Sequence, residues 1–196
     1  MKSVASIVTI MTASLLLWAC GNNPQKQVIS EVPIKTEVLG LKLCEKSSEN
    51  AIKKAIGKTT DAYILTQRQK IGTALAIRAV PVTMDISYGG LSWNYVDVGL
   101  NQDNEIALVS LMASYESIDR AKEQFDAACQ VFTQKYGKGN VYKEEKRAFW
   151  TDNINGIEIS YEESSTVSGE DRCFCTLRYL NKELYEAISE SNVPDV

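Results

Sequence analysis

Alternating hydrophobic and polar positions predict that most of this chain forms β-strands. Apolar residues alternate with polar ones over 157–162, the pattern of a half-buried antiparallel strand. Apolar or alternating runs of strand length also occur at 62–67, 82–88, 91–100, 105–115, 142–151 and 172–180. The segment 71–80 fits either a strand or a helix, and Pro81 interrupts it. The two-residue link Gly89–Gly90 suits a tight hairpin, so 82–115 predicts a three-stranded antiparallel meander.

Three segments of the chain have patterns that predict helices. Ser47 or Ser48 can cap a first helix that carries Ile52, Ala55 and Ile56 on one face and stops at Gly57. Ser117 can cap a longer one that ends before Gly137. Its apolar stripe repeats every three or four residues and comprises Ile118, Ala121, Phe125, Ala128, Cys129, Phe132 and Tyr136. A short terminal helix is predicted over 182–189.

The order of these elements predicts an α+β fold. Helices that bury one stripe pack on an antiparallel sheet, so we expect a layer of helices on one face of the sheet. Loops are predicted at 152–156 and 164–171. The segments 41–58 and 108–138 share the order strand, serine cap, amphipathic helix and Gly-Lys, which is compatible with a pseudo-repeat.

The N-terminus resembles the signal peptide of bacterial lipoproteins. Lys2 precedes an uncharged apolar run over 4–19, which ends in Leu17-Trp18-Ala19-Cys20. The resemblance implies cleavage before Cys20 and acylation of its thiol, with palmitate among the expected chains. Residues 1–19 would then be the signal, 20–37 a polar flexible tether, and 38–196 one α+β domain. An uncleaved anchor, ordinary secretion and a buried helix are the alternatives.

The same resemblance implies a location and a membrane contact. No Asp and no acidic cluster follow Cys20, which for this class of protein implies the periplasmic face of the outer membrane. The expected partners are the membrane, through lipidated Cys20, and another envelope protein. Removal of Lys2 leaves 20 of the 21 basic residues against 25 acidic ones, a net charge of −5. This weak acidity without a clustered basic surface argues against nucleic acid as a partner.

The residue types limit the chemistry of the chain. It contains no histidine, which excludes Ser-His and Cys-His pairs, histidine bases and histidine metal ligands. No glycine-rich phosphate loop precedes a helix, and neither a cofactor nor a metal site is predicted. The acidic pairs at 144–145, 162–163 and 170–171 fit solvated faces. An enzyme or ligand carrier would instead need Glu144, Glu158 or Glu162 to converge in a pocket.

Cysteines are the remaining reactive residues. Besides Cys20 the chain has Cys44, Cys129, Cys173 and Cys175, and an oxidising compartment permits two disulfides in three connectivities. We predict at least one bond from Cys173 or Cys175 to Cys44 or Cys129. A bond between Cys173 and Cys175 is not expected, because neighbouring same-face positions of a strand lie near the upper limit of disulfide separation. Four buried free thiols and a redox-active pair at 173 and 175 are the alternatives.

The domain also resembles small secreted domains of the β-lactamase-inhibitor-protein type. The likeness covers the entry 40–43 with the helix region 47–57, then 90–93, the Val96-x-Val98 strand and the helix of 121–137. The small lipoprotein of the outer-membrane barrel-assembly machinery has a related layout. This resemblance implies an open sheet face that binds other proteins, with no catalytic residues to transfer.

The leading hypothesis is therefore a lipid-anchored, periplasm-facing protein-binding module without catalytic activity. Tyr88, Trp93, Tyr95 and Trp150 lie on predicted strands and are candidates for its binding face. The alternative is that these aromatic side chains fill the core. The competing functional hypothesis is the enzyme or ligand carrier with carboxylates or tyrosines in a pocket.

Overall fold

The computed structural model describes residues 28–58, 63–71, 74–81, 85–165 and 171–190 of the chain. The predicted signal peptide and Cys20 lie outside these residues. Along the chain the elements are β1 (Glu37–Val38), β2 (Leu41–Lys42), α2 (Glu49–Ile56), β3 (Tyr63–Ile71), β4 (Ala74–Pro81), β5 (Ile86–Tyr88), β6 (Leu91–Trp93), β7 (Tyr95–Leu100), β8 (Ile106–Tyr115), α3 (Ile118–Tyr136), β9 (Asn140–Tyr142), β10 (Arg147–Thr151), β11 (Asn155–Ser165), β12 (Asp171–Asn181) and α4 (Lys182–Glu190).

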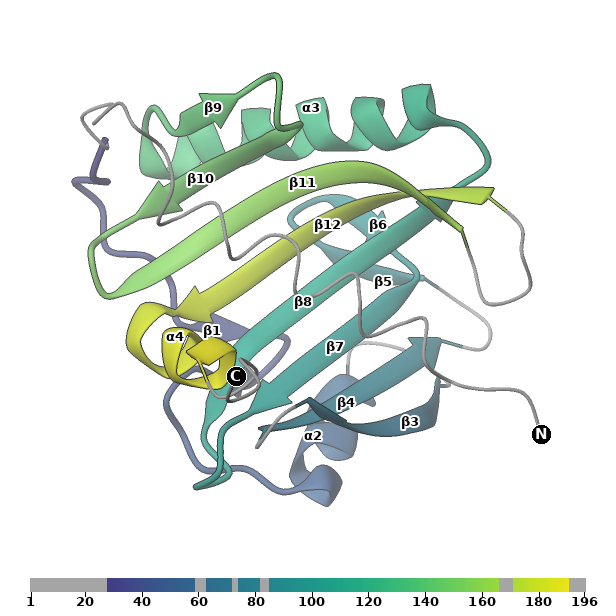
Figure 1. The fold of residues 1–196 in the computed structure, drawn as a ribbon, viewed down its shortest axis with the longest axis vertical. Coiled ribbons are helices and arrows are strands. Elements are labelled where there is room, and N and C mark those ends of the chain that lie inside the picture. Colours follow the sequence, from purple (N-terminus) through teal and green to yellow (C-terminus); the bar gives the residue numbers. More distant parts are fainter. Residues whose placement is uncertain (1–27, 59–62, 72–73, 82–84, 166–170, 191–196) are drawn as a thin grey trace, which may run out of the picture.

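One large antiparallel sheet dominates the fold (Figure 1). Its eight strands follow the order β3-β4-β7-β8-β12-β11-β10-β9, and every neighbouring pair is antiparallel. β8 and β12 lie side by side in the middle, and β3 and β9 form the edges. The α+β class with an antiparallel sheet is thus confirmed.

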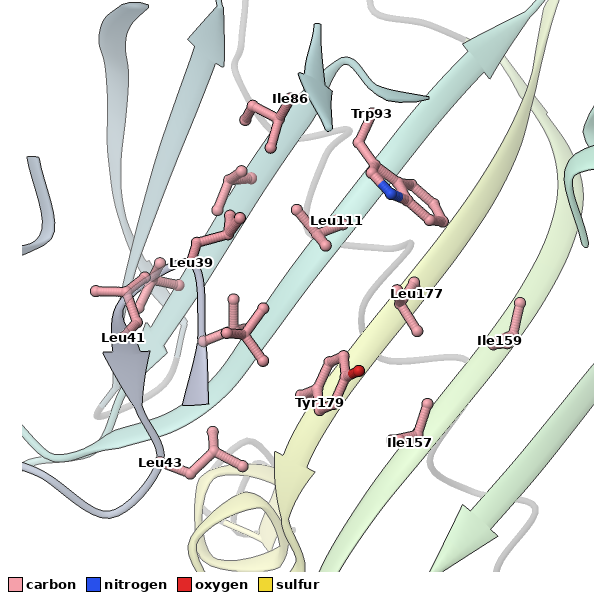
Figure 2. Close-up of a cluster of buried hydrophobic side chains, with 14 of the residues drawn as sticks. Leu39, Leu41, Leu43, Ile86, Trp93, Leu111, Ile157, Ile159, Leu177 and Tyr179 are labelled. Carbon is pink, nitrogen blue, oxygen red and sulfur yellow. The ribbon is translucent and has the colours of Figure 1, made fainter. Parts of the chain in front are cut away.

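The hydrophobic core lies between α3 and one side of this sheet, which we call the core face. Register places core residues of neighbouring strands directly opposite one another: Val109 faces Tyr179, which faces Ile157, which faces Trp150. Figure 2 shows part of this core, including Tyr179 and Ile157, with Leu39, Leu41 and Leu43 on one side of it. Ile52 and Ile56 of α2 belong to the same core. The alternation read from the sequence is therefore the alternation between the two sheet faces.

The helix ends are formed by the predicted residues. The Ser117 hydroxyl accepts from the backbone N–H of Arg120, and α3 ends where Gly137 takes a φ of 78°. The Ser48 hydroxyl accepts from the N–H of Ala51, so Ser48 rather than Ser47 caps α2, and Gly57 ends it. Because the caps are local, sequence alone identified them correctly.

The predicted meander over 82–115 is wrong in its first part. β5 and β6 do form a hairpin through Gly89 and Gly90, both at positive φ, but this hairpin is a separate two-stranded sheet. The segment 91–100 breaks at Asn94, whose side-chain oxygen accepts from the N–H of Ser114. Only β7, after this break, pairs with β8. Residues 82–84 of the predicted strand lie outside the described residues.

Two further predictions of length need correction. The single strand expected over 142–151 is a hairpin of β9 and β10 joined by a turn at 143–146, with Lys146 at a φ of 53°. The loop expected over 164–171 is shorter, because β11 continues to Ser165 and β12 begins at Asp171. Within the ambiguous segment over 71–80, Ile71 ends β3 and residues 74–80 belong to strand β4, which ends at Pro81.

The ordered fold begins before the predicted domain boundary at residue 38. The backbone N–H of Val28 donates to the side chain of Asn140, and that of Ser30 donates to the carbonyl oxygen of Thr151. Ile34 is buried in the core, and its N–H donates to Asp152. Residues 28–37, expected to be part of the tether, are therefore docked on the domain.

Candidate functional site

The side of the large sheet away from α3, which we call the second face, carries a row of polar and charged residues. In this row, residues directly opposite one another in five neighbouring strands are Arg78, Asp97, Ser110, Arg178 and Glu158. All except Arg78 are buried. Buried charges require partners, and the row provides them in two pairs.

The first pair joins β4 to β7. The Nε and Nη2 atoms of Arg78 each donate to one carboxylate oxygen of Asp97, both at 2.6 Å. The ring of Tyr95 lies beside this pair, with the Arg78 Cζ atom 5.8 Å from its centroid. Burial alone would lower the pKa of Arg78, but the hydrogen bond and charge of Asp97 raise it above its ordinary value. This two-point contact keeps the Arg78 guanidinium charged.

The second pair joins β12 to β11. Arg178 Nη1 lies 2.5 Å from Glu158 Oε1, and their side chains are only 6% and 9% exposed. Burial would lower the pKa of Arg178, but the negative charge of Glu158 more than reverses that effect. Tyr185 of α4 interacts with the same pair, and burial raises the pKa of its phenol. The position of α4 thus departs from the predicted arrangement, in which all helices lie on one face of the sheet, because its Tyr185 contributes to the second face.

Glu162 also lies on this face, and its carboxyl pKa is shifted. It lies four residues after Glu158 on β11, opposite Phe174 of β12. Burial raises the pKa of Glu162 above its ordinary value, and the nearby charge of Arg178 partly opposes that. Glu162 therefore holds its proton to a higher pH than an exposed carboxyl does.

Around the buried row the second face presents partly exposed aromatic, methionine and arginine side chains. Tyr95, Met112, Tyr142, Arg147 and Phe174 all have intermediate exposure. Tyr95 lies opposite Met112, and Tyr142 lies opposite Arg147, whose Cζ atom is 5.1 Å from the tyrosine ring centroid. Arg147 pairs with Glu145, but its buried Nε has no hydrogen-bond partner. Tyr, Met, Phe and Arg are the types enriched in protein–protein interfaces.

The four aromatics predicted as a binding face do not form one surface. Trp93 and Trp150 are 0% and 1% exposed and belong to the core. Their indole N–H groups donate to the carbonyl oxygens of Tyr88 and Gly137, respectively. Tyr88 is half-buried, and its hydroxyl donates to that of Tyr179 at 3.1 Å. Only Tyr95 lies on the second face, so the core alternative holds for both tryptophans.

The three predicted carboxylates do not converge. Glu144 is exposed in the turn between β9 and β10, whereas Glu158 and Glu162 lie on the second face. Of the acidic pairs expected on solvated faces, Glu162 is half-buried and Glu163 is exposed. Within the described ranges, no three Cys, Asp or Glu side chains are grouped so as to hold a metal ion. None of the helices described there is long and apolar enough to cross a membrane.

The structure differs from the predicted disulfide, because Cys44, Cys129, Cys173 and Cys175 are all free. Cys44 is exposed and bonded through its N–H to Ile106, whereas Cys175 lies opposite Ala113. Seven residues of β8 separate Ile106 from Ala113, which is about 24 Å of strand. This distance is too great for a disulfide between Cys44 and Cys175. Cys175 is buried and close enough to Cys129 of α3 for the two thiols to interact electrostatically. Helix packing thus brings these two together without a bond.

Sequence reasoning missed the paired charges of the second face. The available signal was a charged residue between core residues of a strand, as with Arg78 after Ile77, Asp97 between Val96 and Val98, and Arg178 before Tyr179. Such positions must point away from the core. Which charges pair depends on strand register, which the pattern does not contain.

Comparison of the chain with models of protein families, with curated proteins and with solved structures gave no match.

Proposed function

We propose that this chain is a lipid-anchored, periplasm-facing protein-binding module that acts without catalysis, and that the second face binds its partner. The lipid anchor is supported by the apolar run that ends in Ala19-Cys20. The absence of histidine supports binding over catalysis, because it removes the commonest general base and nucleophile activator.

The observation that carries the proposal is the composition of the second face. Its partly exposed Tyr95, Met112, Phe174 and Arg147 surround a buried row of ion pairs. Rigid aromatic side chains bury large areas at small entropic cost, and arginine forms planar contacts with carboxylates. Both paired arginines have raised pKa values, so they remain charged and offer no proton for acid catalysis near neutral pH.

Site-specific photocrosslinking in the bacterial envelope tests this face. A photoreactive amino acid is placed at Phe174 in the lipidated protein, and the control carries it at Gln130, an exposed position on α3. We expect a discrete adduct from position 174 and none from position 130. Equal adducts at both positions, or none at 174 in a variant with an unchanged melting temperature, contradict a binding role for the second face.

A separate experiment tests the anchor. Cys20→Ser removes the thiol that would be acylated, so the variant should partition into the soluble fraction after cell disruption. The control is Cys44→Ser, which removes an exposed thiol and should leave the protein in the membrane fraction. A Cys20→Ser protein that stays in the membrane with unchanged mobility contradicts the lipoprotein interpretation.

We also propose that the fold is a repeat of one helix followed by four strands of the large sheet, with the β5–β6 hairpin added in the first half. Its first half is α2 with β3, β4, β7 and β8, and its second half is α3 with β9, β10, β11 and β12. The strand order runs inward through each half, so that the last strands, β8 and β12, meet at the centre. This division supports two helix-plus-strands units. Because β8 ends the first half, the segments 41–58 and 108–138 correspond only in their helices, and the pseudo-repeat stays a prediction.

A further inference from the structure

Five large hydrophobic side chains are strongly exposed among the residues that the structure describes. They are Val28, Ile29, Val32, Val141 and Ile154, each 41–64% exposed. Single exposed apolar residues are common on soluble proteins, but a group of them at one place indicates a contact surface.

Hydrogen bonds link the three segments that carry these five residues, at the point where the chain enters the fold. Val28 exchanges two hydrogen bonds with the side chain of Asn140, the residue before Val141. The N–H of Ser30 donates to the carbonyl oxygen of Thr151. Its hydroxyl bonds to the carbonyl oxygens of Val32 and of Tyr136 in α3. Ile154 donates through its N–H to Asp152, which also accepts from Ile34. We call the five residues the entry patch.

The position of Cys20 limits how far the entry patch can lie from a lipid anchor. The eight residue steps from Cys20 to Val28 span at most about 29 Å when fully extended. The residues between, Gly-Asn-Asn-Pro-Gln-Lys-Gln, are polar throughout and cannot cover an apolar surface. Because the anchor holds the membrane this close, the effective concentration of lipid at the entry patch is high, and even a weak contact between the two is favoured.

Basic side chains border the entry patch. Lys135 and Lys138 are exposed at the C-terminal end of α3, where Ser30 bonds to the carbonyl oxygen of Tyr136. Lys35 is also exposed, and its N–H donates to the hydroxyl of Tyr136. Glu31 is the one exposed acid among residues 28–34. Apolar residues flanked by lysines are the arrangement that adsorbs to an anionic lipid surface.

We propose that the entry patch lies against the membrane in which Cys20 is anchored, with its apolar side chains in the interface between headgroups and acyl chains. The inference rests on the proposed lipid anchor. It fixes the orientation of the domain, because the end of α3 at Ser117 then points away from the lipid. The helix rises about 27 Å between Ile118 and Tyr136.

Fluorescence quenching in vesicles tests this orientation. The full lipidated protein, in a Cys44→Ser background, carries an added cysteine at Ile154, or at Asp119 in the control, labelled with a polarity-sensitive dye. Both positions are exposed. Vesicles of phosphatidylethanolamine and phosphatidylglycerol contain lipids with a quencher in the acyl chain. We expect quenching and a blue shift at position 154 and neither at position 119.

A Val141→Asp variant separates contact from mere tethering. Val141 is 51% exposed, so the change should leave the fold intact, but it places a charge in the interface. Quenching at position 154 should therefore fall. Quenching that is absent at 154, or unchanged by Val141→Asp, overturns the proposal. Shielding of 154 from both lipid and aqueous quenchers also overturns it, because a protein then covers the patch.

The mass of the N-terminal peptide and flotation with the vesicles are measured on the same samples. An acylated, floating protein without quenching at 154 refutes the entry patch alone. A protein with no acyl chain refutes the proposed anchor and, with it, this orientation.

Discussion

Gly139 packs against the indole of Trp150 so closely that an alanine there should destabilise the fold through that one ring. A Cβ atom at position 139 would lie 2.4 Å from Cε2, 2.7 Å from Nε1 and 2.8 Å from Cζ2 of Trp150. Two contacts hold the ring in place. Its Nε1 donates to the carbonyl oxygen of Gly137 at 3.0 Å, and the centroid of the Phe132 ring lies 5.9 Å from the Trp150 ring centroid. Gly139 does not have positive φ, so the backbone itself accepts alanine.

The expected magnitudes follow from this geometry. Gly139→Ala overpacks the core and should lower the free energy of unfolding by about 1–3 kcal/mol. Trp150→Ala removes an aromatic side chain that is 1% exposed and should lower it by about 3–5 kcal/mol. In the double variant the clash is gone, and alanine in place of glycine restricts the unfolded chain by about 0.4–1 kcal/mol. The double variant should therefore be no less stable than Trp150→Ala alone.

Urea unfolding of the purified Cys20→Ser protein, followed by far-UV circular dichroism, measures this double-mutant cycle. The control is Trp93→Ala, which removes an equally buried tryptophan that is not among the atoms nearest to Gly139. There the loss from Gly139→Ala should persist. If Gly139→Ala is additive with Trp150→Ala within about 0.5 kcal/mol, the close contact is not what excludes a side chain at position 139.

Further expectations concern the buried charges and thiols. Glu158→Leu should lower the free energy of unfolding by about 3–5 kcal/mol, because it leaves Arg178 charged and buried. The double variant with Arg178→Met should recover part of that loss. Equal losses in the single and the double variant, measured by urea unfolding, would contradict this. The raised pKa of Glu162 means that the folded state binds its proton more tightly than the unfolded state, so stability should fall as pH rises from the ordinary carboxyl pKa through the raised one. Glu162→Gln should lack that decrease, and an unchanged pH profile of the melting temperature would refute the assignment. Of the four described thiols, only the exposed Cys44 should react rapidly with maleimide in the native protein, since burial raises the pKa of Cys129 to about 12. After denaturation, mass spectrometry should find all four thiols alkylated.

Local patterns predicted the elements that depend on local interactions. The α3 helix lies between its predicted cap at Ser117 and its predicted end at Gly137, because capping bonds and the 3.6-residue period involve only neighbours in sequence. The turn at 143–146 was missed because it is polar and contains no Gly or Pro, and Lys146 takes positive φ instead. The break at Asn94 was missed because its side chain bonds to Ser114, twenty residues away.

The candidate site could be predicted only in part. Charged residues between core positions of a strand indicate a second, polar side of the sheet, and the sequence contains that signal at Asp97 and Arg178. The sequence pattern could not show that Arg178 pairs with Glu158, since that pairing depends on the register between β11 and β12. For the same reason the pattern could not separate Tyr95, on the second face, from Trp93 and Trp150 in the core.

The sequence by itself determined the period of the alternating strand over 157–162, the ends of both capped helices and the lipobox-like order that ends at Cys20. These features depend on residues a few positions apart. Only the tertiary structure decided which charges are paired, which thiols are free and where residues 28–37 dock. Those outcomes depend on contacts between segments far apart in the chain. Burial then sets the energy of each contact, because water is excluded only when the whole sheet has formed.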